Sequence, residues 1–181
     1  MGYKLVLADP PWREQGGGGR GAQRHYPLMD TQAIANLGQE LRPHLDDHAF
    51  LFLWATVSHL PDALAVMRSW GFRYVTNAVW CKSSRGLGHY LRMQHEHLLI
   101  GVQGHPPYSH RPQGKGSAAG RVVMPSVIHA ARGAHSVKPQ AVHDYAETFS
   151  QGPYLEMFAR KCRMGWDAWG NEVGMDVLGE S

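Results

Sequence analysis

Two short, almost unbroken apolar runs constrain the fold of this chain more than any other feature of its sequence. Tyr3–Ala8 reads Tyr-Lys-Leu-Val-Leu-Ala, and residues 49–55 read Ala-Phe-Leu-Phe-Leu-Trp-Ala. Such a run predicts a strand that is covered on both faces, because a strand with one solvated face would alternate polar and apolar residues. The first run ends at Pro10 and Pro11, which have no amide hydrogen with which to continue a ladder. The sequence therefore predicts a sheet with helices on both of its faces.

The rest of the chain alternates between the two periodicities. Helical spacing and end signals predict helices at Thr31–Leu41, from residue 60 to a stop at Gly71, and from Pro139 to about Ser150. Apolar runs predict further strands at residues 72–81, 96–102, 154–159 and 166–169, with a shorter strand within residues 122–129. This alternation predicts an α/β fold with a mostly parallel sheet, and we expect residues 1–181 to form one domain.

The first predicted strand ends in the sequence Asp9-Pro10-Pro11-Trp12. Ligands of open α/β sheets bind beyond the carboxyl ends of the strands, so this position suits an active site. An aromatic amine is a poor nucleophile until its two hydrogens are held, and the Asp9 carboxylate and the Pro10 carbonyl are both acceptors. Trp12 offers a flat face on which a base could stack. The alternative is a strand end capped by a Pro-Pro turn with a buried tryptophan.

The charge distribution is uneven along the chain. Residues 82–143 contain eight Lys or Arg and one acid, Glu96, whereas the remainder contains ten basic and fourteen acidic residues. A basic segment of this kind is a candidate footprint for a polyanion, with Arg111 and Lys115 as predicted phosphate contacts; the alternative is a solvated surface. No apolar stretch approaches the roughly 18 residues of a membrane span, and no signal peptide is evident, so we expect a cytoplasmic protein without a membrane partner.

Two further patterns carry less weight. His95 and His97 alternate on a predicted strand and so share a face, but no third ligand is evident and we predict no metal site. The glycine-rich residues 16–21 are not followed by the Gly-Lys-Ser/Thr of a phosphate-binding loop. We interpret them as a mobile gate over the amine site.

Eight blocks in sequence order give the chain its resemblance to a known family. They are Leu-Ala-Asp-Pro-Pro-Trp (7–12), Tyr-Pro-Leu-Met (26–29), Phe-Leu-Phe-Leu-Trp (50–54), Ala-Val-Trp-Cys-Lys (78–82), Glu-His-Leu-Leu-Ile-Gly-Val (96–102), His-Ser-Val-Lys-Pro (135–139), Tyr-Leu-Glu-Met-Phe-Ala-Arg (154–160) and Gly-Trp-Asp-Ala-Trp-Gly-Asn-Glu (165–172). With these blocks the chain resembles the adenine N6-methyltransferase family typified by the catalytic subunit of the eukaryotic messenger-RNA enzyme. The resemblance implies a Rossmann-like, S-adenosylmethionine-dependent methyltransferase fold with circularly permuted motif order.

The resemblance also implies roles for individual residues. Asp9, Pro10, Pro11 and Trp12 match the catalytic motif. The expected cofactor-binding residues are Asp9, Lys138, Arg160, Asn171 and Glu172. Lys138 would reach the carboxylate of S-adenosylmethionine, and Glu172 stands where the eukaryotic enzymes commonly have an amide. The expected substrate side comprises Tyr26, Trp54, Trp80, Lys82, Arg111 and Lys115. For the two tryptophans, simple packing is the alternative.

One departure concerns the turn after the predicted cofactor strand, where no glycine-rich segment follows Phe158. The family uses Arg160 and Asn171 there instead. The implied reaction is transfer of a methyl group from S-adenosylmethionine to the N6 amine of adenine, with DNA as the expected polymer because compact members suit DNA modification. The alternatives are an RNA adenine methyltransferase, a catalytically silent nucleic-acid-binding member of the fold, and a methyltransferase for cytosine N4 or a small-molecule amine.

Overall fold

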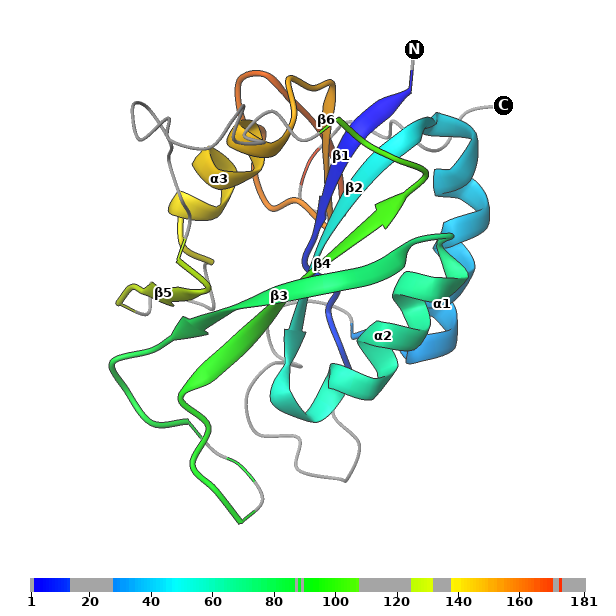
Figure 1. Ribbon diagram of the computed structural model, residues 1–181. Helices are drawn as coiled ribbons and strands as arrows, with labels where there is room; N and C mark the ends of the chain where they lie inside the picture. Colours follow the sequence, from blue (N-terminus) through cyan, green and yellow to red (C-terminus); the bar gives the residue numbers. More distant parts are fainter. Residues whose placement is uncertain are drawn as a thin grey trace.

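A seven-stranded sheet with the strand order β5-β3-β4-β2-β1-β6-β7 forms the centre of the computed structural model (Figure 1). The structure describes residues 2–13, 28–86, 88, 90–107, 125–131, 138–170 and 173. The strands are β1 (Tyr3–Ala8), β2 (Leu45–Thr56), β3 (Arg73–Cys81), β4 (His95–Gln103), β5 (Val127–His129), β6 (Tyr154–Met157) and β7 (Trp166–Trp169). The helices are α1 (Thr31–Leu41), α2 (Leu60–Ser69) and α3 (Ala141–Phe149), with 3-10 turns η2 (Arg42–His44) and η3 (Val57–His59).

The sheet is mostly parallel, as predicted. β1 pairs in parallel with β2 and β6, β6 with β7, and β3 with β5. β4 is antiparallel to both of its neighbours, β2 and β3. Six strands therefore run in one direction and β4 runs in the other, so the connection between β3 and β4 stays at one edge of the sheet.

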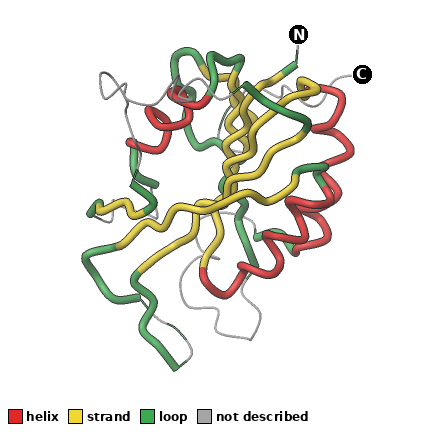
Figure 2. The backbone as a smooth tube through the Cα atoms, in the orientation of Figure 1, coloured by secondary structure: helices red, strands yellow, loops and turns green. Residues whose placement is uncertain are grey.

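Helices cover both faces of the sheet, as the two unbroken apolar runs predicted. Figure 2 shows α1 and α2 on one side of the strands and α3 on the other. Alternate residues of β2 enter two separate apolar cores: Leu51 and Leu53 pack with α1 and α2, whereas Phe50 and Phe52 pack on the side of α3. This two-sided burial is the physical reason for the unbroken apolar run at residues 49–55.

The largest differences from the predicted strand ends are in β2 and β6, whereas β3 and β4 differ by one residue at one end or both. β2 begins at Leu45 rather than residue 49, because Leu45 pairs with Tyr3 of β1 and extends the ladder through polar residues. β6 ends at Met157 rather than residue 159, because Phe158 turns the backbone into the left-handed region with φ +62°. Among the described residues no helix is long and apolar enough to span a membrane.

The strand directions define one end of the sheet, at which the parallel strands finish, and we call this end the functional edge. The chain leaves β1 through α1 to reach β2 on one side, whereas β6 and β7 lie on the other side of β1. The topology therefore switches direction between β1 and β6, and such switch points are where open α/β sheets bind ligands. The six strands that share a direction end at this edge, and the reversed strand β4 begins there.

Candidate active site

Asp9 follows the last residue of β1 and so lies at the switch point. Its amide N–H still donates to the Met157 carbonyl of β6, at 3.4 Å. Beyond it the motif folds back on itself, because the Trp12 N–H donates to the Pro10 carbonyl at 2.9 Å and the Met29 N–H donates to the Pro11 carbonyl at 2.9 Å. A carbonyl oxygen can accept two hydrogen bonds, so Pro10 retains acceptor capacity for a further donor.

Four charged side chains meet beside Asp9, and we call Asp9, Lys82, Glu96 and Lys138 the charge quartet. Lys138 Nζ lies 2.7 Å from Asp9 Oδ1 and 3.4 Å from Glu96 Oε2. Lys82 Nζ pairs with the other oxygen of Glu96, Oε1. The side chains of Lys138 and Glu96 are only 16% and 11% exposed. Two cations and two carboxylates thus balance each other in a largely water-excluded place, with Glu96 bridging both lysines.

The quartet shifts the pKa values of its two most enclosed members. Burial acts to raise the pKa of Glu96, but the charges and hydrogen bonds of Lys138 and Lys82 outweigh burial and leave this pKa below its ordinary value. Burial acts to lower the pKa of Lys138, but Asp9 and Glu96 outweigh it and leave that pKa above its ordinary value. Both residues therefore stay charged across the neutral range.

Trp54 and Trp80 lie under the two lysines. Lys138 Nζ is 5.6 Å from the centroid of the Trp54 ring, and Lys82 Nζ is 4.9 Å from that of Trp80. The two indoles meet edge to face at 6.1 Å, and each is 1% exposed. The structure therefore places them as packed supports of the lysines, which is the alternative that the sequence left open; direct contact with substrate stays a prediction.

Trp12 is also buried, at 8% exposure. Its Nε1–H donates to the Trp54 carbonyl at 3.0 Å, and one face of its indole stacks on the ring of His59 at 5.6 Å between centroids. In this arrangement Trp12 anchors the motif to the core instead of presenting an open face. Stacking of a base on Trp12 remains a prediction.

The side of the switch point toward β6 and β7 contains a tight backbone contact. Phe158 adopts a left-handed conformation that usually favours glycine, and its ring packs edge to face on Trp169 at 5.3 Å. A Cβ on Gly170 would lie 2.6 Å from the Ala159 carbonyl oxygen, so only glycine allows this approach. The turn after β6 thus combines a left-handed residue with a close approach of two backbone segments. Arg160 lies directly beyond it.

Several predicted site residues fall outside the described part of the chain. These are Tyr26, Arg111, Lys115, Asn171 and Glu172, as well as the predicted gate at residues 16–21. His95 and His97 do share a face, with ring centroids 5.2 Å apart. Within the described residues, no three His, Cys, Asp or Glu side chains are grouped so that they could hold a metal ion.

Two residues of the site were not predicted from the sequence. Glu96 carried a usable signal, because it is the one acid within the basic residues 82–143 and begins a strand. His59 carried none, because it is one of twelve histidines and follows an apolar strand without a recognisable motif. It is 3% exposed and contacts the catalytic motif.

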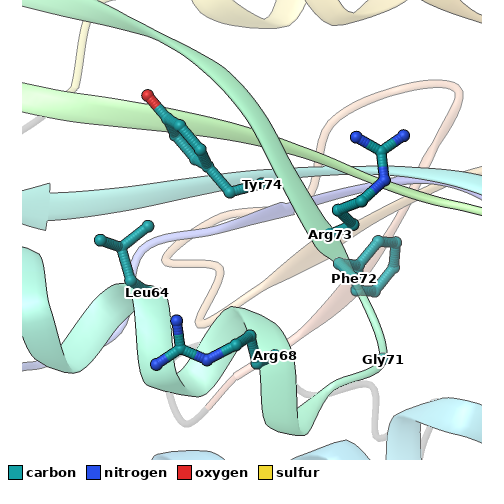
Figure 3. Close-up of a pocket in the computed structure, with 6 residues that line it drawn as sticks. All are labelled: Leu64, Arg68, Gly71, Phe72, Arg73 and Tyr74. Carbon is teal, nitrogen blue, oxygen red and sulfur yellow. The ribbon is translucent and has the colours of Figure 1, made fainter.

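An open pocket lies elsewhere, between α2 and the start of β3 (Figure 3). Its lining residues are Leu64, Arg68, Gly71, Phe72, Arg73 and Tyr74. Arg73 is the first residue of β3, whereas Cys81 at the other end of that strand pairs with His95 at the functional edge. The pocket therefore lies toward the edge opposite Asp9 and is separate from the charge quartet.

Comparisons with known proteins show the family of this chain. The MT-A70 family model matches residues 3–172. The chain is 32% identical to the Type II methyltransferase M.MunI of a Mycoplasma species, over 94% of this chain and 78% of that protein. It is 26% identical to the human N(6)-adenosine-methyltransferase catalytic subunit METTL3, over 97% of this chain but 29% of that protein. It is 25% identical to an MT-A70-like N(6)-adenosine-methyltransferase of Arabidopsis thaliana, over 98% of this chain and 25% of that protein. The chain spans about a quarter to a third of the length of these eukaryotic relatives. From the match over nearly its whole length, the chain belongs to the MT-A70 family of methyltransferases.

Proposed function

We propose that this chain transfers the methyl group of S-adenosylmethionine to the N6 amine of adenine in nucleic acid, with DNA as the polymer. The observation that carries the proposal is the Asp9 carboxylate, which stands at the switch point of the sheet and is held there by Lys138 at 2.7 Å. Family membership supports the reaction type, and similarity to eukaryotic N(6)-adenosine-methyltransferases supports adenine N6 as the acceptor.

The residues at the switch point fit S-adenosylmethionine. A carboxylate and an ammonium group, Asp9 and Lys138, lie together where a bound amino acid would need partners of both signs. On the other side of β6, Gly170 approaches Ala159 closely at the same edge, and Asn171 and Glu172 follow it in the sequence. When bound, this cofactor supplies a methyl group activated by a positive sulfonium.

The chain's own residues position the acceptor amine and neutralise charge. The Asp9 carboxylate and the second acceptor site of the Pro10 carbonyl would receive the two N–H groups of the amine, which frees its lone pair for attack. The nitrogen gives up one proton as the new N–C bond forms, and Asp9 is the carboxylate placed to accept it. Lys138 and Glu96 fix the direction of Asp9, so catalysis rests on preorganisation and not on a covalent enzyme intermediate.

DNA is the finer part of the proposal. DNA is supported by the similarity to a Type II methyltransferase, which extends over 78% of the length of that protein. In addition, a compact chain suits a DNA-modification enzyme. If the DNA is double-stranded, the target adenine must leave the stack to reach Asp9. RNA is the second candidate, and the adenosine-methyltransferase names of the eukaryotic relatives favour it.

The test is a methyl-transfer assay on matched polymers. The purified chain is incubated with isotopically labelled S-adenosylmethionine and with DNA or RNA of the same mixed sequence, and the digested nucleosides are identified by mass spectrometry. We expect labelled N6-methyldeoxyadenosine, and none with an Asp9→Ala variant. Product in RNA alone would transfer the proposal to the second candidate, whereas N4-methylcytosine or no product would refute adenine methylation.

A further inference from the structure

His59 ends η3, directly after β2, at the functional edge of the sheet. The residue is 3% exposed, so its imidazole is buried. In the hydrogen bonds of the described residues it contacts no member of the charge quartet; its partners are Thr56, Ser58 and the carbonyl of Arg13, directly after the Asp-Pro-Pro-Trp motif. A polar ring buried at this position requires an explanation, because burial without partners would cost stability.

Both ring nitrogens of His59 have partners, and together these partners assign the tautomer. Nε2 lies 3.0 Å from the carbonyl oxygen of Arg13. A carbonyl can only accept, so Nε2 carries the hydrogen and donates it. In the neutral ring Nδ1 is then the acceptor, and it receives the Thr56 hydroxyl at 2.7 Å. Thr56 thus orients His59, and His59 holds the backbone of Arg13.

The same ring also restrains Trp12. The imidazole and the indole are stacked with an interplanar angle of 18° and a centroid distance of 5.6 Å. The indole is fixed on its other side by the hydrogen bond of its Nε1–H to the Trp54 carbonyl. His59 therefore restrains two consecutive residues: it stacks on the indole of Trp12 and donates a hydrogen bond to the carbonyl of Arg13. Both residues lie at the end of the motif that is remote from Lys138.

We propose that His59 is a positioning residue for methyl transfer, which rests on the proposed function and deepens it. Lys138 fixes the start of the motif at Asp9, and His59 fixes its end at Trp12 and Arg13. The Pro10 carbonyl lies between these two anchors and accepts from the Trp12 N–H at 2.9 Å. A shift of Trp12 would therefore turn the Pro10 carbonyl, which is one of the two acceptors for the amine. We assign His59 no direct contact with substrate or cofactor.

The test uses two substitutions that each retain one half of the imidazole. The amide of His59→Asn ends near the position of Nδ1, so it can meet Thr56 but cannot reach Arg13. The amide nitrogen of His59→Gln extends to the position of Nε2 and can still donate to the Arg13 carbonyl. His44→Asn, in η2 at the other edge of the sheet, is the matched control. The readouts are kcat, KM for DNA, the Kd of S-adenosylmethionine and the thermal midpoint of each variant.

We expect His59→Asn to lower kcat by about 10- to 100-fold, because small misplacements of a reacting group have effects of this size. The Kd of S-adenosylmethionine should stay within about twofold of the wild type, because the cofactor side is anchored by other residues. His59→Gln should recover most of the rate. A structural role alone would lower the thermal midpoint without this recovery and without the separation of kcat from cofactor binding.

Thr56→Val provides a second variant in which His59 is kept and the fold is less perturbed. It removes the hydroxyl that donates to Nδ1 and orients the ring, so we expect a loss of kcat in the same direction as His59→Asn and no further loss when both changes are combined. Wild-type kcat in His59→Asn, or equal losses in the Asn and Gln variants, would overturn the proposal while leaving the proposed function intact. An inactive wild-type chain would instead overturn the proposed function, and this inference with it.

Discussion

Lys138→Met tests the charge quartet most directly, because methionine keeps an apolar stem over Trp54 and removes only the charge. At an effective dielectric of about 20, two unit charges 3 Å apart attract by roughly 5 kcal/mol, and removal of one partner of a fully buried pair costs about 3–5 kcal/mol. Lys138 contacts Asp9 and Glu96 at 2.7 and 3.4 Å, but the side chains of Asp9 and Lys138 are 27% and 16% exposed. Solvent screening therefore reduces the expected loss of unfolding free energy to about 2–3 kcal/mol.

A double-mutant cycle separates the pair from the rest of the site. Glu96→Gln alone leaves Lys82 and Lys138 as neighbouring cations, whereas the double variant with Lys138→Met removes that repulsion. We expect the double variant to lose about 1–2 kcal/mol less unfolding free energy than the sum of the two single losses, measured by urea unfolding at pH 7. Calorimetry should show S-adenosylmethionine binding to Lys138→Met about 10- to 100-fold more weakly, since one charge-assisted bond is worth about 1.5–3 kcal/mol.

Lys4→Met is the matched control, because it removes a lysine charge near the start of β1, at the opposite end of the same strand. Its unfolding free energy and cofactor affinity should stay close to the wild type. Additivity of Lys138→Met and Glu96→Gln within about 0.5 kcal/mol would refute the bridging network. An unchanged Kd for S-adenosylmethionine would remove Lys138 from the cofactor site even if the network holds.

Four further outcomes are expected. Asp9→Ala should lower kcat by at least about 10²-fold while the circular dichroism spectrum stays unchanged, because Asp9 lies past a strand end and acts on the transition state. Burial acts to raise the pKa of Glu96, but the opposing lysines outweigh it and leave this pKa below its ordinary 4.5, so the ionised form stabilises the fold above about pH 4.5. This contribution should disappear as the pH falls through the lower folded pKa, and urea unfolding of Glu96→Gln should lack that part of the pH dependence. Gly170→Ala should destabilise the chain by about 1–3 kcal/mol in urea and weaken cofactor binding, because its Cβ would meet backbone at 2.6 Å. Charge reversal of Arg85 and Arg92, in the β3–β4 connection, should weaken DNA binding about equally for all sequences. It should also reduce the slope of log binding constant against log salt concentration by about 0.9 for each lost phosphate contact. An unchanged slope would exclude contact of these arginines with the DNA backbone.

The fold could be predicted because its main signals are local and physical. The runs at residues 3–8 and 49–55 are apolar throughout since each strand is buried on both faces, and the prolines after Asp9 end the first strand wherever it folds. The antiparallel direction of β4 could not be predicted, because its apolar pattern is the same in either direction. Strand direction depends on how the chain between two strands turns, and the residues of β4 carry no mark of that turn.

The site was predictable only where a residue belongs to a motif. Asp9 and Lys138 were paired with the same ligand from the resemblance, and the structure brings them within 2.7 Å of each other. Glu96 was visible as an isolated acid, but its bridge to two lysines depends on the reversed strand that places it at the functional edge. His59 depends on a backbone carbonyl 46 residues away, and no composition or spacing reports such a contact.

The reversed strand β4 also has a consequence for how enzymes of this shape can diverge. Because β3 and β4 are joined at the functional edge, the described residues of their connection, 82–86, 88 and 90–94, project from the body of the sheet, as Figure 1 shows, and do not cross either face. Changes of length between Arg85 and Arg92 would leave both apolar cores and the β1–β6 switch point undisturbed. The length and charge of this hairpin can therefore differ among relatives without any change in the sheet that holds the charge quartet.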